Sequence, residues 1–516
     1  MGIPHHEPVA DLQLDFHDLN ENDLDHEFDT GSLAVSASRM KLRDIVELCE
    51  RVYCKSIGTE YMHMVDTAKR DWMREKLEGS QGIYNVTTED RLRILQMLTA
   101  AEGLEKYLHT KYVGQKRFSL EGGDSLIPLL HETMLYAGAN DVEEVVIGMA
   151  HRGRLNVLAN VLRKPVRNIY KEFEGESYEE RISLRDVKYH LGYSNLVKTD
   201  EGKEVVLNIV PNPSHLESSA PVIEGISRAR IDHIYEGDNN KLVPVIIHGD
   251  AAIAGQGVVY EVIQMSELPG YQTGGTIHLV INNQVGFTTN YLDARSSTYC
   301  TDVGKVTKAP IWHVNGDDVE GLVHVMRMAI EYRQLFHSDV FIDILAYRKY
   351  GHNEGDEPRF TQPTLYKAIA RHPNPRDIYS KKLVEQGVLT QADIKKTESE
   401  FDSRLEKELE ASRKKKKVTI QQFMEDQWEG MVYSSPRDFE KPLETGVPSK
   451  TLIKIAKQLN TLPKDLVFFK KTLKLVEERA RMIKDNKVDW ALGELLAYGS
   501  LLLEQHPVRI SGQDSI

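Results

Sequence analysis

The chain has 516 residues and carries 65 Lys and Arg against 78 Asp and Glu, a formal net charge of −13. This length predicts about three domains. The content of 41% apolar and 28% charged residues is typical of a globular protein and excludes a disordered or fibrous chain. The acidic balance argues against a nucleic-acid partner. A membrane span is also excluded, because no apolar run reaches about 18 residues.

Three cysteines, Cys49, Cys54 and Cys300, are too few for a disulfide framework in a chain of this length. They also lack the spacing of a metal site. The cysteine content therefore predicts a reducing compartment.

The first 36 residues predict an acidic, weakly structured lead-in. A helical domain is expected over 37–130, because apolar residues recur every three to four positions from Leu42 to about Tyr112. Within it, Thr87 stands before Glu89 and Asp90, a pattern that predicts a helix start.

From 131 to 370 the pattern changes to short apolar runs that alternate with amphipathic stretches. The runs are rich in β-branched residues and show little alternation, as strands buried on both faces of a parallel sheet do. The expected strands are Val145–Met149, Val205–Val210, Val243–Ile247, Ile277–Ile281 and Val340–Leu345. Helices are expected at about 154–163, 217–234, 256–268 and 318–336. This alternation predicts an α/β domain with a doubly wound, mainly parallel sheet.

Residues 371–480 predict a charged helical linker region. Its basic run Arg413–Lys417 is interpreted as a solvated helix end, with contact to an acidic surface as the alternative. The stretch 481–516 predicts the start of a second α/β domain: a buried helix at Trp490–Leu503, then a strand and loop at Val508–Asp514. Because this unit stops partway, we expect the chain to be truncated there.

Polar, glycine-rich or histidine-bearing clusters follow each of the five expected strands. Ligands of open α/β sheets bind outside the carboxyl ends of the strands, so five such clusters predict one large polar site. The clusters are Ala150–Arg154, Pro211–His215, His248–Ala251, Asn282–Gly286 and Tyr347–Glu354.

The most specific pair is Asp250 and Asn283. Thirty residues, 252 to 281, separate the two motifs, which is enough for one crossover helix and the next strand. The two side chains are therefore expected on neighbouring strand ends. A carboxylate, an amide oxygen and a nearby carbonyl suit Mg²⁺, and Gly249 with the following stretch allows a diphosphate to approach the backbone.

This pair resembles the thiamin diphosphate signature, and the surrounding motifs resemble the E1 components of 2-oxoglutarate dehydrogenases. The resemblance runs from about residue 37 to the end. It is carried by His151–Asn160, Lys188–Gly192, Asn212–Glu217, His248–Gly257, Ile281–Thr289 and Gly351–Pro358.

The resemblance implies roles for individual residues. Asp250, Asn283 and the carbonyl of Val285 would hold Mg²⁺. Arg152, Ser214, Leu216, Ala251 and Ala252 would contact thiamin diphosphate together with the metal ligands. The catalytic candidates are His190 and His215, which would face the 2-oxo acid, and the nearby His248, His313 and His352.

Structural alternatives stand beside these roles. Asp250 could cap a helix, and each of the histidines could be a packed loop or strand residue. Arg154 could brace the loop that carries Arg152, and Glu217 and Glu354 could be caps or ion-pair partners.

The resemblance further implies decarboxylation of 2-oxoglutarate, succinyl transfer to the lipoyl domain of a dihydrolipoyl succinyltransferase, and a homodimer. A 2-oxoadipate enzyme, a non-oxidative 2-oxoglutarate decarboxylase, a non-catalytic fragment and a metal-dependent hydrolase are the alternatives. A bacterial cytoplasmic location is expected, or the mitochondrial matrix if the source is eukaryotic. The segment that docks the family onto its E2 core is not recognisable, and the glutamate that activates the cofactor is expected beyond Ile516.

Overall fold

The computed structural model describes residues 9–174, 187–199, 202–414, 423–432 and 434–512. Two compact units divide it, Met1–Glu429 and Gly430–Ile516. The first contains the sheet and the predicted site, and the second contains helices.

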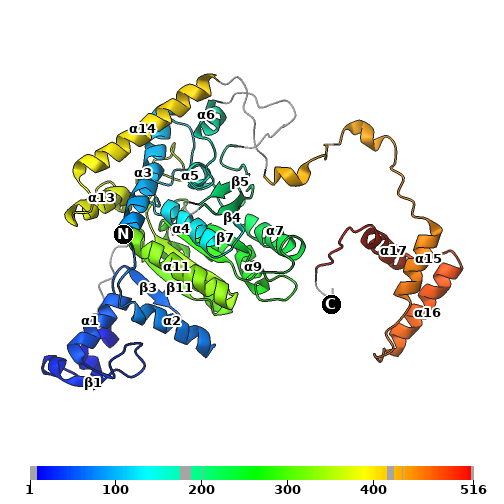
Figure 1. Ribbon diagram of the computed structural model, residues 1–516, viewed down its shortest axis with the longest axis horizontal. Helices are drawn as coiled ribbons and strands as arrows, with labels where there is room; N and C mark the ends of the chain where they lie inside the picture. Colours follow the sequence, from blue (N-terminus) through cyan, green and yellow to red (C-terminus); the bar gives the residue numbers. More distant parts are fainter. Residues whose placement is uncertain (1–8, 175–186, 200–201, 415–422, 433, 513–516) are drawn as a thin grey trace. The chain divides into compact units, whose positions relative to one another are not determined.

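An eight-stranded mixed sheet forms the centre of the first unit (Figure 1). In spatial order its strands are β3 (Ile57–Glu60), β11 (Ile311–Asn315), β12 (Val340–Leu345), β8 (Ile277–Asn282), β7 (Leu242–Gly249), β4 (Glu144–Met149), β6 (Glu204–Ile209) and β5 (Tyr193–Lys198).

The six inner strands run parallel, and the edge strands β3 and β5 are each antiparallel to their neighbour. In the register of the central pair, Ile247 of β7 lies beside Leu279 of β8. All parallel strands therefore end at one edge, which brings the loops that follow them together.

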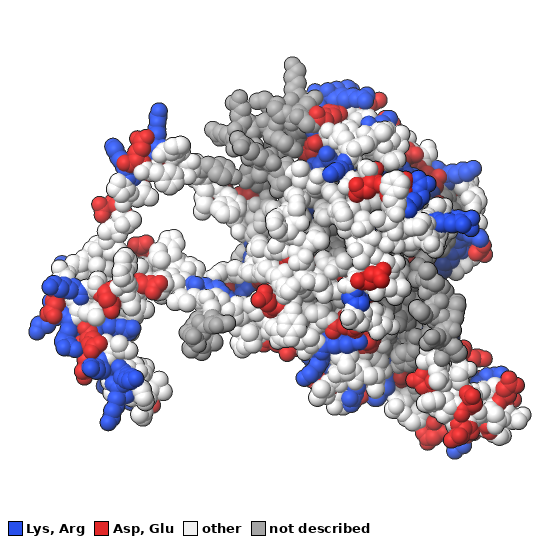
Figure 2. Space-filling model, turned by 180° about the vertical axis from the view of Figure 1, so that it is seen from behind, with Lys and Arg blue, Asp and Glu red and all other residues white. Residues whose placement is uncertain are grey.

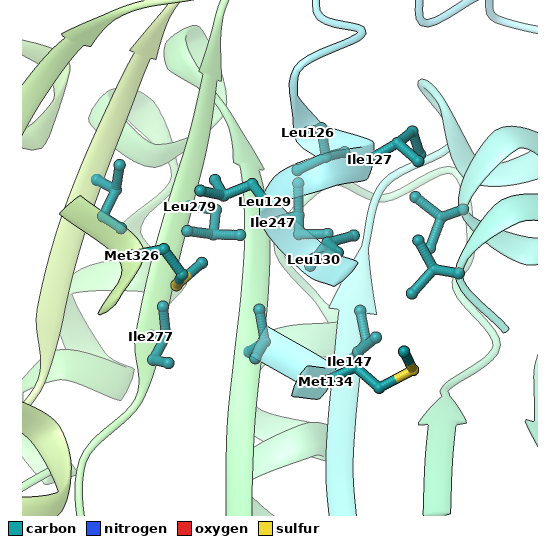
Figure 3. Close-up of a cluster of buried hydrophobic side chains, with 14 of the residues drawn as sticks. Leu126, Ile127, Leu129, Leu130, Met134, Ile147, Ile247, Ile277, Leu279 and Met326 are labelled. Atoms are coloured by element: carbon teal, nitrogen blue, oxygen red, sulfur yellow. The ribbon is translucent and has the colours of Figure 1, made fainter. Parts of the chain in front are cut away.

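One face of the sheet is covered by α3 (Thr88–Lys111), α4 (Leu126–Ala139), α5 (Arg154–Asn160) and α11 (Val319–Phe336). Figure 3 shows Leu129 and Leu130 of α4 beside Ile247 and Leu279 of the sheet, with Met326 of α11 at the same layer. These side chains are fully or almost fully buried. Burial of this size supplies the main favourable free energy of folding.

The opposite face packs against α7 (Ser219–His233), α8 (Asp250–Gly255), α9 (Gly257–Met265) and the 3₁₀ helix η4 (Cys300–Thr307). Ile223 of α7 packs in one cluster with Val146 of β4 and Ile246 of β7. Ile263 of α9 packs in a second cluster with Val280 of β8. The sheet is thus buried on both sides, which explains why its central strands are mostly apolar.

The remaining elements of this unit lie at its periphery or in the loops. They are η1 (Ala10–Leu12), η2 (Leu14–His17), η3 (Glu21–Asp25), β1 (Glu27–Asp29), β2 (Arg39–Lys41), α1 (Leu42–Tyr53), α2 (Thr67–Gly79), α6 (Val166–Glu174), β9 (Val285–Gly286), β10 (Thr289–Asn290), α10 (Tyr291–Ala294), η5 (Pro358–Phe360), α12 (Pro363–Ile369), α13 (Pro375–Glu385), α14 (Gln391–Lys414) and η6 (Glu425–Trp428).

The second unit contains η7 (Pro436–Phe439), α15 (Ser449–Leu459), α16 (Lys470–Lys484) and α17 (Trp490–Leu503). Its small core is built by Ile455, Ala456, Leu492 and Leu496. No helix in the described ranges combines the length and the apolar character that a membrane crossing requires.

The predicted α/β class, the five strands and the four helices between them are confirmed, with boundaries shifted by a few residues. The start of α3 is also confirmed: Thr87 and Asp90 form reciprocal bonds, each 3.1 Å long, at its N-terminus.

Two expectations for the second unit were wrong in part. The helix at Trp490–Leu503 exists, but Trp490 is 96% exposed, because only one narrow side of α17 packs against α15. No strand forms over 508–512, since the described part of this unit holds no other strand to pair with it. Residues 513 and 514 of the expected strand and 415–417 of the basic run lie outside the described residues. The domain boundaries remain predictions.

Candidate active site

A cavity of about 540 Å³ opens at the carboxyl edge of β4, β7 and β8. It is built by the loops that follow these strands and β12, together with Leu216 from the loop after β6. Residues of the expected clusters thus meet at one place. The lining residues include His151, Arg152, Leu216, Asp250, Ala251, Ala252, Asn283, Val285, Phe287, Arg348 and His352.

Asp250 lies at the end of β7 with its side chain at the cavity wall. It is 2% exposed, and its Oδ2 atom has no hydrogen-bond partner. The nearest cation is Arg295, whose Nη1 lies 3.9 Å from that oxygen. Burial raises the pKa of Asp250 to about 6, although Arg295 opposes the shift. A buried oxygen without a partner is costly unless a ligand completes it, so the residue is suited to hold a cation.

Asn283 and Val285 stand opposite Asp250, in the turn after β8. The Asn283 Oδ1 atom accepts a bond from the Val285 amide at 3.4 Å, and Gln284 between them has φ 65°. This left-handed residue makes the turn tight. The turn brings Asn283 and Val285 to the cavity that Asp250 also lines. The three groups therefore fit the oxygen-donor set that Mg²⁺ takes.

Two histidines, His151 and His352, also line the cavity. The ring centroids of His151 and His352 lie 5.6 Å apart, and Phe287 packs 4.8 Å from His352. Burial, reinforced by the charge of Arg152, lowers the pKa of His151 to about 3 and lowers that of His352 as well. Both imidazoles are therefore neutral at pH 7, and each can donate one N–H and accept one hydrogen.

The cavity also contains two arginines whose bonds go to neutral oxygens. Arg152 donates to the carbonyls of Ser119 and His352, at 3.2 and 2.7 Å. Arg348 donates to the carbonyls of Tyr350 and Phe287 and to the Tyr366 hydroxyl. Within the described ranges neither forms an ion pair with a carboxylate within 4.0 Å. Their uncompensated charge favours an anionic ligand.

Arg154 is fully buried and does not reach the cavity. It donates to the carbonyls of Met149 and Leu191 at 2.9–3.0 Å and also to that of Val210. These oxygens belong to the ends of β4 and β6 and to the loop after His190. Arg154 therefore braces the loops of the site, which is the structural alternative that the sequence offered for this residue.

Nine of the thirteen site residues expected from the sequence line the cavity: Arg152, Leu216, His248, Asp250, Ala251, Ala252, Asn283, Val285 and His352. Ser214 and His190 lie in neighbouring loops, 3.4 Å apart through Oγ and Nε2. His215 lines a separate small pocket beside Leu216. His313 lies elsewhere.

His248 lies at the cavity wall, but its ring nitrogens point elsewhere. Nδ1 is 2.6 Å from Glu217 Oε2, and Nε2 is 2.9 Å from His278 Nδ1. The ring is 2% exposed and stacks on His278. Because both nitrogens are engaged within the protein, the structure does not support direct contact of this imidazole with a substrate.

His313 sits in β11, and the structure does not bring it to the cavity. Its Nδ1 is 2.8 Å from Asp343 and its Nε2 is 2.8 Å from Glu60, on the edge strand β3. Burial opposes charge here, but the bonds to the two carboxylates outweigh it and raise the pKa to about 9. The residue is a buried imidazolium that ties β3 to the sheet.

Among the cavity residues that were not site candidates are His151, Phe287 and Arg348, whose side chains are suited to bind a ligand. Each directly adjoins or lies within a cluster that follows an expected strand, so position alone could have found them. In the described part of the chain, no group of three or more His, Cys, Asp or Glu side chains could hold a metal ion. The hydrolase alternative therefore lacks its metal site there.

The family model named Dehydrogenase E1 component matches residues 96–421. The chain belongs to this family, whose members the sequence motifs resembled. It is 43% identical over 519 aligned residues to the 2-oxoglutarate dehydrogenase E1 component of Azotobacter vinelandii. The alignment covers 100% of this chain and 54% of that protein.

The proteins of the same name from Cupriavidus necator and Brucella ovis are also 43% identical. Their alignments cover 98% and 91% of this chain, and 53% and 48% of the two relatives, respectively. The chain spans about half the length of the curated relatives it matches.

Proposed function

We propose that the chain is part of an E1 component that decarboxylates 2-oxoglutarate with thiamin diphosphate and transfers the succinyl group to lipoamide. The observation that carries the proposal is the buried, unpartnered Oδ2 of Asp250 in one cavity with Asn283 and Val285. This donor set is what a Mg²⁺ ion bound to a diphosphate requires. The similarity to the three relatives supports the choice of substrate.

In this proposal Asp250, Asn283 and the Val285 carbonyl hold Mg²⁺. Ala251, Ala252, Leu216 and Ser214 surround thiamin diphosphate. The cofactor supplies the electron sink for decarboxylation when it is bound. The protein's own contribution is to bind the anionic groups, exclude water and donate hydrogen bonds.

The arginines and histidines carry the contacts to the substrate. The guanidinium groups of Arg152 and Arg348 attract the anions, because neutral oxygens alone occupy their donors. Neutral His151 and His352 donate N–H groups to a substrate oxygen that gains negative charge. His190 and His215, in the loops beside the cavity, remain assigned to the 2-oxo acid.

The proposal also includes two macromolecular partners. The lipoyl domain of a dihydrolipoyl succinyltransferase would receive the succinyl group, and a homodimer would complete the site. The relatives named above are bacterial, and a cytoplasmic location is proposed for this chain.

The test uses the full-length protein with thiamin diphosphate and Mg²⁺. We expect it to reduce ferricyanide with 2-oxoglutarate, and to show a higher kcat/KM for 2-oxoglutarate than for 2-oxoadipate. The reverse order would identify a 2-oxoadipate enzyme, and release of succinic semialdehyde without lipoamide would identify a decarboxylase. No reduction with either acid would overturn the proposal.

Calorimetry on residues 1–516 alone separates a fragment from a complete site. Weak or absent binding of thiamin diphosphate with Mg²⁺ is the expected result if, as proposed, a second copy of the protein completes the site.

A further inference from the structure

A segment between α3 and α4 crosses the carboxyl edge of the sheet without regular structure. The Phe118 carbonyl accepts a bond from the Gly153 amide at 2.9 Å, and the Ser119 carbonyl accepts from Arg152. The Glu121 carbonyl accepts from the Lys349 amide at 3.3 Å. Residues 117–121 thereby join the loop after β4 to the loop after β12, both of which line the cavity.

The carboxylate of Glu354 holds this segment in place. Its Oε2 atom accepts the amides of Arg117 and Phe118, at 2.8 and 3.2 Å, and its Oε1 atom accepts the amide of Ser119 at 2.8 Å. The Glu354 side chain is 3% exposed. Three successive amides that converge on one anion form a nest, a concave site that binds negative charge.

Phe118, in the middle of the nest, has φ 51°. A bulky residue with positive φ is disfavoured unless its surroundings impose it. The bond to Glu354 is one such constraint. Nearby, the Arg117 guanidinium bonds to Glu105 and Glu121 at 3.0 and 3.1 Å and lies 3.9 Å from Glu354, so the buried carboxylates are balanced.

The imposed backbone places the Phe118 ring beside both cavity histidines. The ring centroid lies 4.2 Å from that of His151 and 5.7 Å from that of His352. Arg152 also bonds to the His352 carbonyl, at 2.7 Å. The orientation of both imidazoles therefore depends on the conformation that Glu354 holds at Phe118.

We infer that Glu354 is a positioning residue that acts through Phe118 to orient His151 and His352. This inference rests on the proposed function for its kinetic consequence. Glu354 does not line the cavity, and its three bonds to the amides of 117–119 connect it to Phe118.

The first test measures kcat/KM for 2-oxoglutarate in the full-length enzyme. Glu354→Gln replaces one acceptor oxygen with an NH₂ group that faces amide donors. We expect kcat/KM to fall by about 10- to 100-fold, the size of effect that misplaced catalytic groups cause. Glu357→Gln, three residues away and exposed, is the matched control and should remain within about twofold of wild type.

A double-mutant cycle with Phe118→Leu separates positioning from a general structural role. If Glu354 acts through the ring, adding Glu354→Gln to Phe118→Leu should lower kcat/KM by less than about threefold. A full repeat of the single-mutant loss in that background, or a Glu354→Gln enzyme within twofold of wild type, would overturn the inference.

Hydrogen exchange of the full chain gives a readout that needs no substrate. In Glu354→Gln the amides of 117–119, and that of Gly153 which donates to Phe118, should exchange faster than in wild type or Glu357→Gln. Wild type that does not turn over 2-oxoglutarate would refute the proposed function alone. Unchanged exchange at these four amides would refute the positioning role of Glu354, whatever the activity.

Discussion

Asp250 is a buried carboxylate whose charged form is disfavoured by its surroundings. It is buried, it lacks a hydrogen-bond partner at Oδ2, and the nearest cation lies 3.9 Å away. Arg295 and nearby backbone amides only partly offset the cost of burying this carboxylate, so its pKa stays above the ordinary value. In the proposed function, a bound cation would supply the missing positive charge.

We therefore expect Asp250→Ala to abolish Mg²⁺-dependent binding of thiamin diphosphate while the fold is kept. Calorimetry on the full-length protein measures the binding, and circular dichroism measures the fold. Asp232→Ala is the control, since Asp232 lies on α7 in an exposed pair with Arg228. Wild-type affinity in the Asp250→Ala protein would contradict the assignment of this residue as a metal ligand.

A second residue-scale prediction concerns His313 and pH. The groups that face it are Asp343, Glu60, the Tyr299 ring at 4.0 Å and Lys305, which pairs with Glu60. Its folded pKa of about 9 exceeds the ordinary value of 6.5, so its charge stabilises the fold fully below pH 6.5 and less as pH rises through 9. Glu60, whose pKa the same bonds lower to about 2 despite burial, stays ionised throughout.

Accordingly, His313→Gln should lower the unfolding free energy most at pH 6, by on the order of 3 kcal/mol, and the deficit should shrink toward pH 9. Thermal melting of both full-length proteins across this range provides the measurement. A deficit that grows with pH would show that the residue is neutral in the folded protein.

At the scale of elements, the sequence predicted five of the six inner strands and missed β11 and the two edge strands. The predicted strands are mostly apolar, so their pattern is local. The strands β3 and β5 carry polar residues such as Glu60 and Asn195, because one side of an edge strand faces solvent or loops. In β11, His313 interrupts the apolar run, and only its buried ion pairs make a strand possible there.

The site was predictable to the same extent. Asp250, Asn283 and Arg152 directly follow strands, so their place at the carboxyl edge comes from topology alone. The bonds of Glu354 to 117–119 span about 235 positions in the chain. No local pattern indicates such a contact, and Phe118 appears in the sequence as an ordinary core residue.

Helix–sheet packing yields a prediction at this scale. A Cβ atom added at Gly148 of β4 would clash with Ile223 of α7, whereas one added at Gly225 of the same helix meets nothing within 4 Å. Gly148→Ala should destabilise the protein by about 1–3 kcal/mol through overpacking. Gly225→Ala should stabilise it by up to about 1 kcal/mol through helix propensity. Melting temperatures that shift in the same direction for both would contradict this packing.

At the scale of the whole molecule, the chain is acidic, whereas the cavity is lined by two arginines, Arg152 and Arg348, as well as by Asp250 and Asp293. The chain carries −13, and Figure 2 shows acidic side chains gathered over the N-terminal segment, which contains Asp11, Asp15, Asp18, Glu21, Asp23 and Asp25. Around the cavity, Arg152 and Arg348 have only neutral acceptors. Because salt screens charges beyond about 10 Å at 0.1 M, the near arginines should dominate the potential that a bound anion experiences.

The affinity for thiamin diphosphate with Mg²⁺ held constant should therefore fall as salt rises from about 50 to 300 mM, as expected when attraction to local cations outweighs repulsion by the distant acidic surface. Arg348→Gln should weaken binding at low salt and flatten the dependence, since it removes one of the two unpaired cations. Arg359→Gln should change neither, because Arg359 is exposed and already paired with Glu357. Calorimetry at four salt concentrations measures all three proteins. An affinity that rises with salt in wild type would mean that the net negative charge, and not the cavity arginines, governs the approach of the anion.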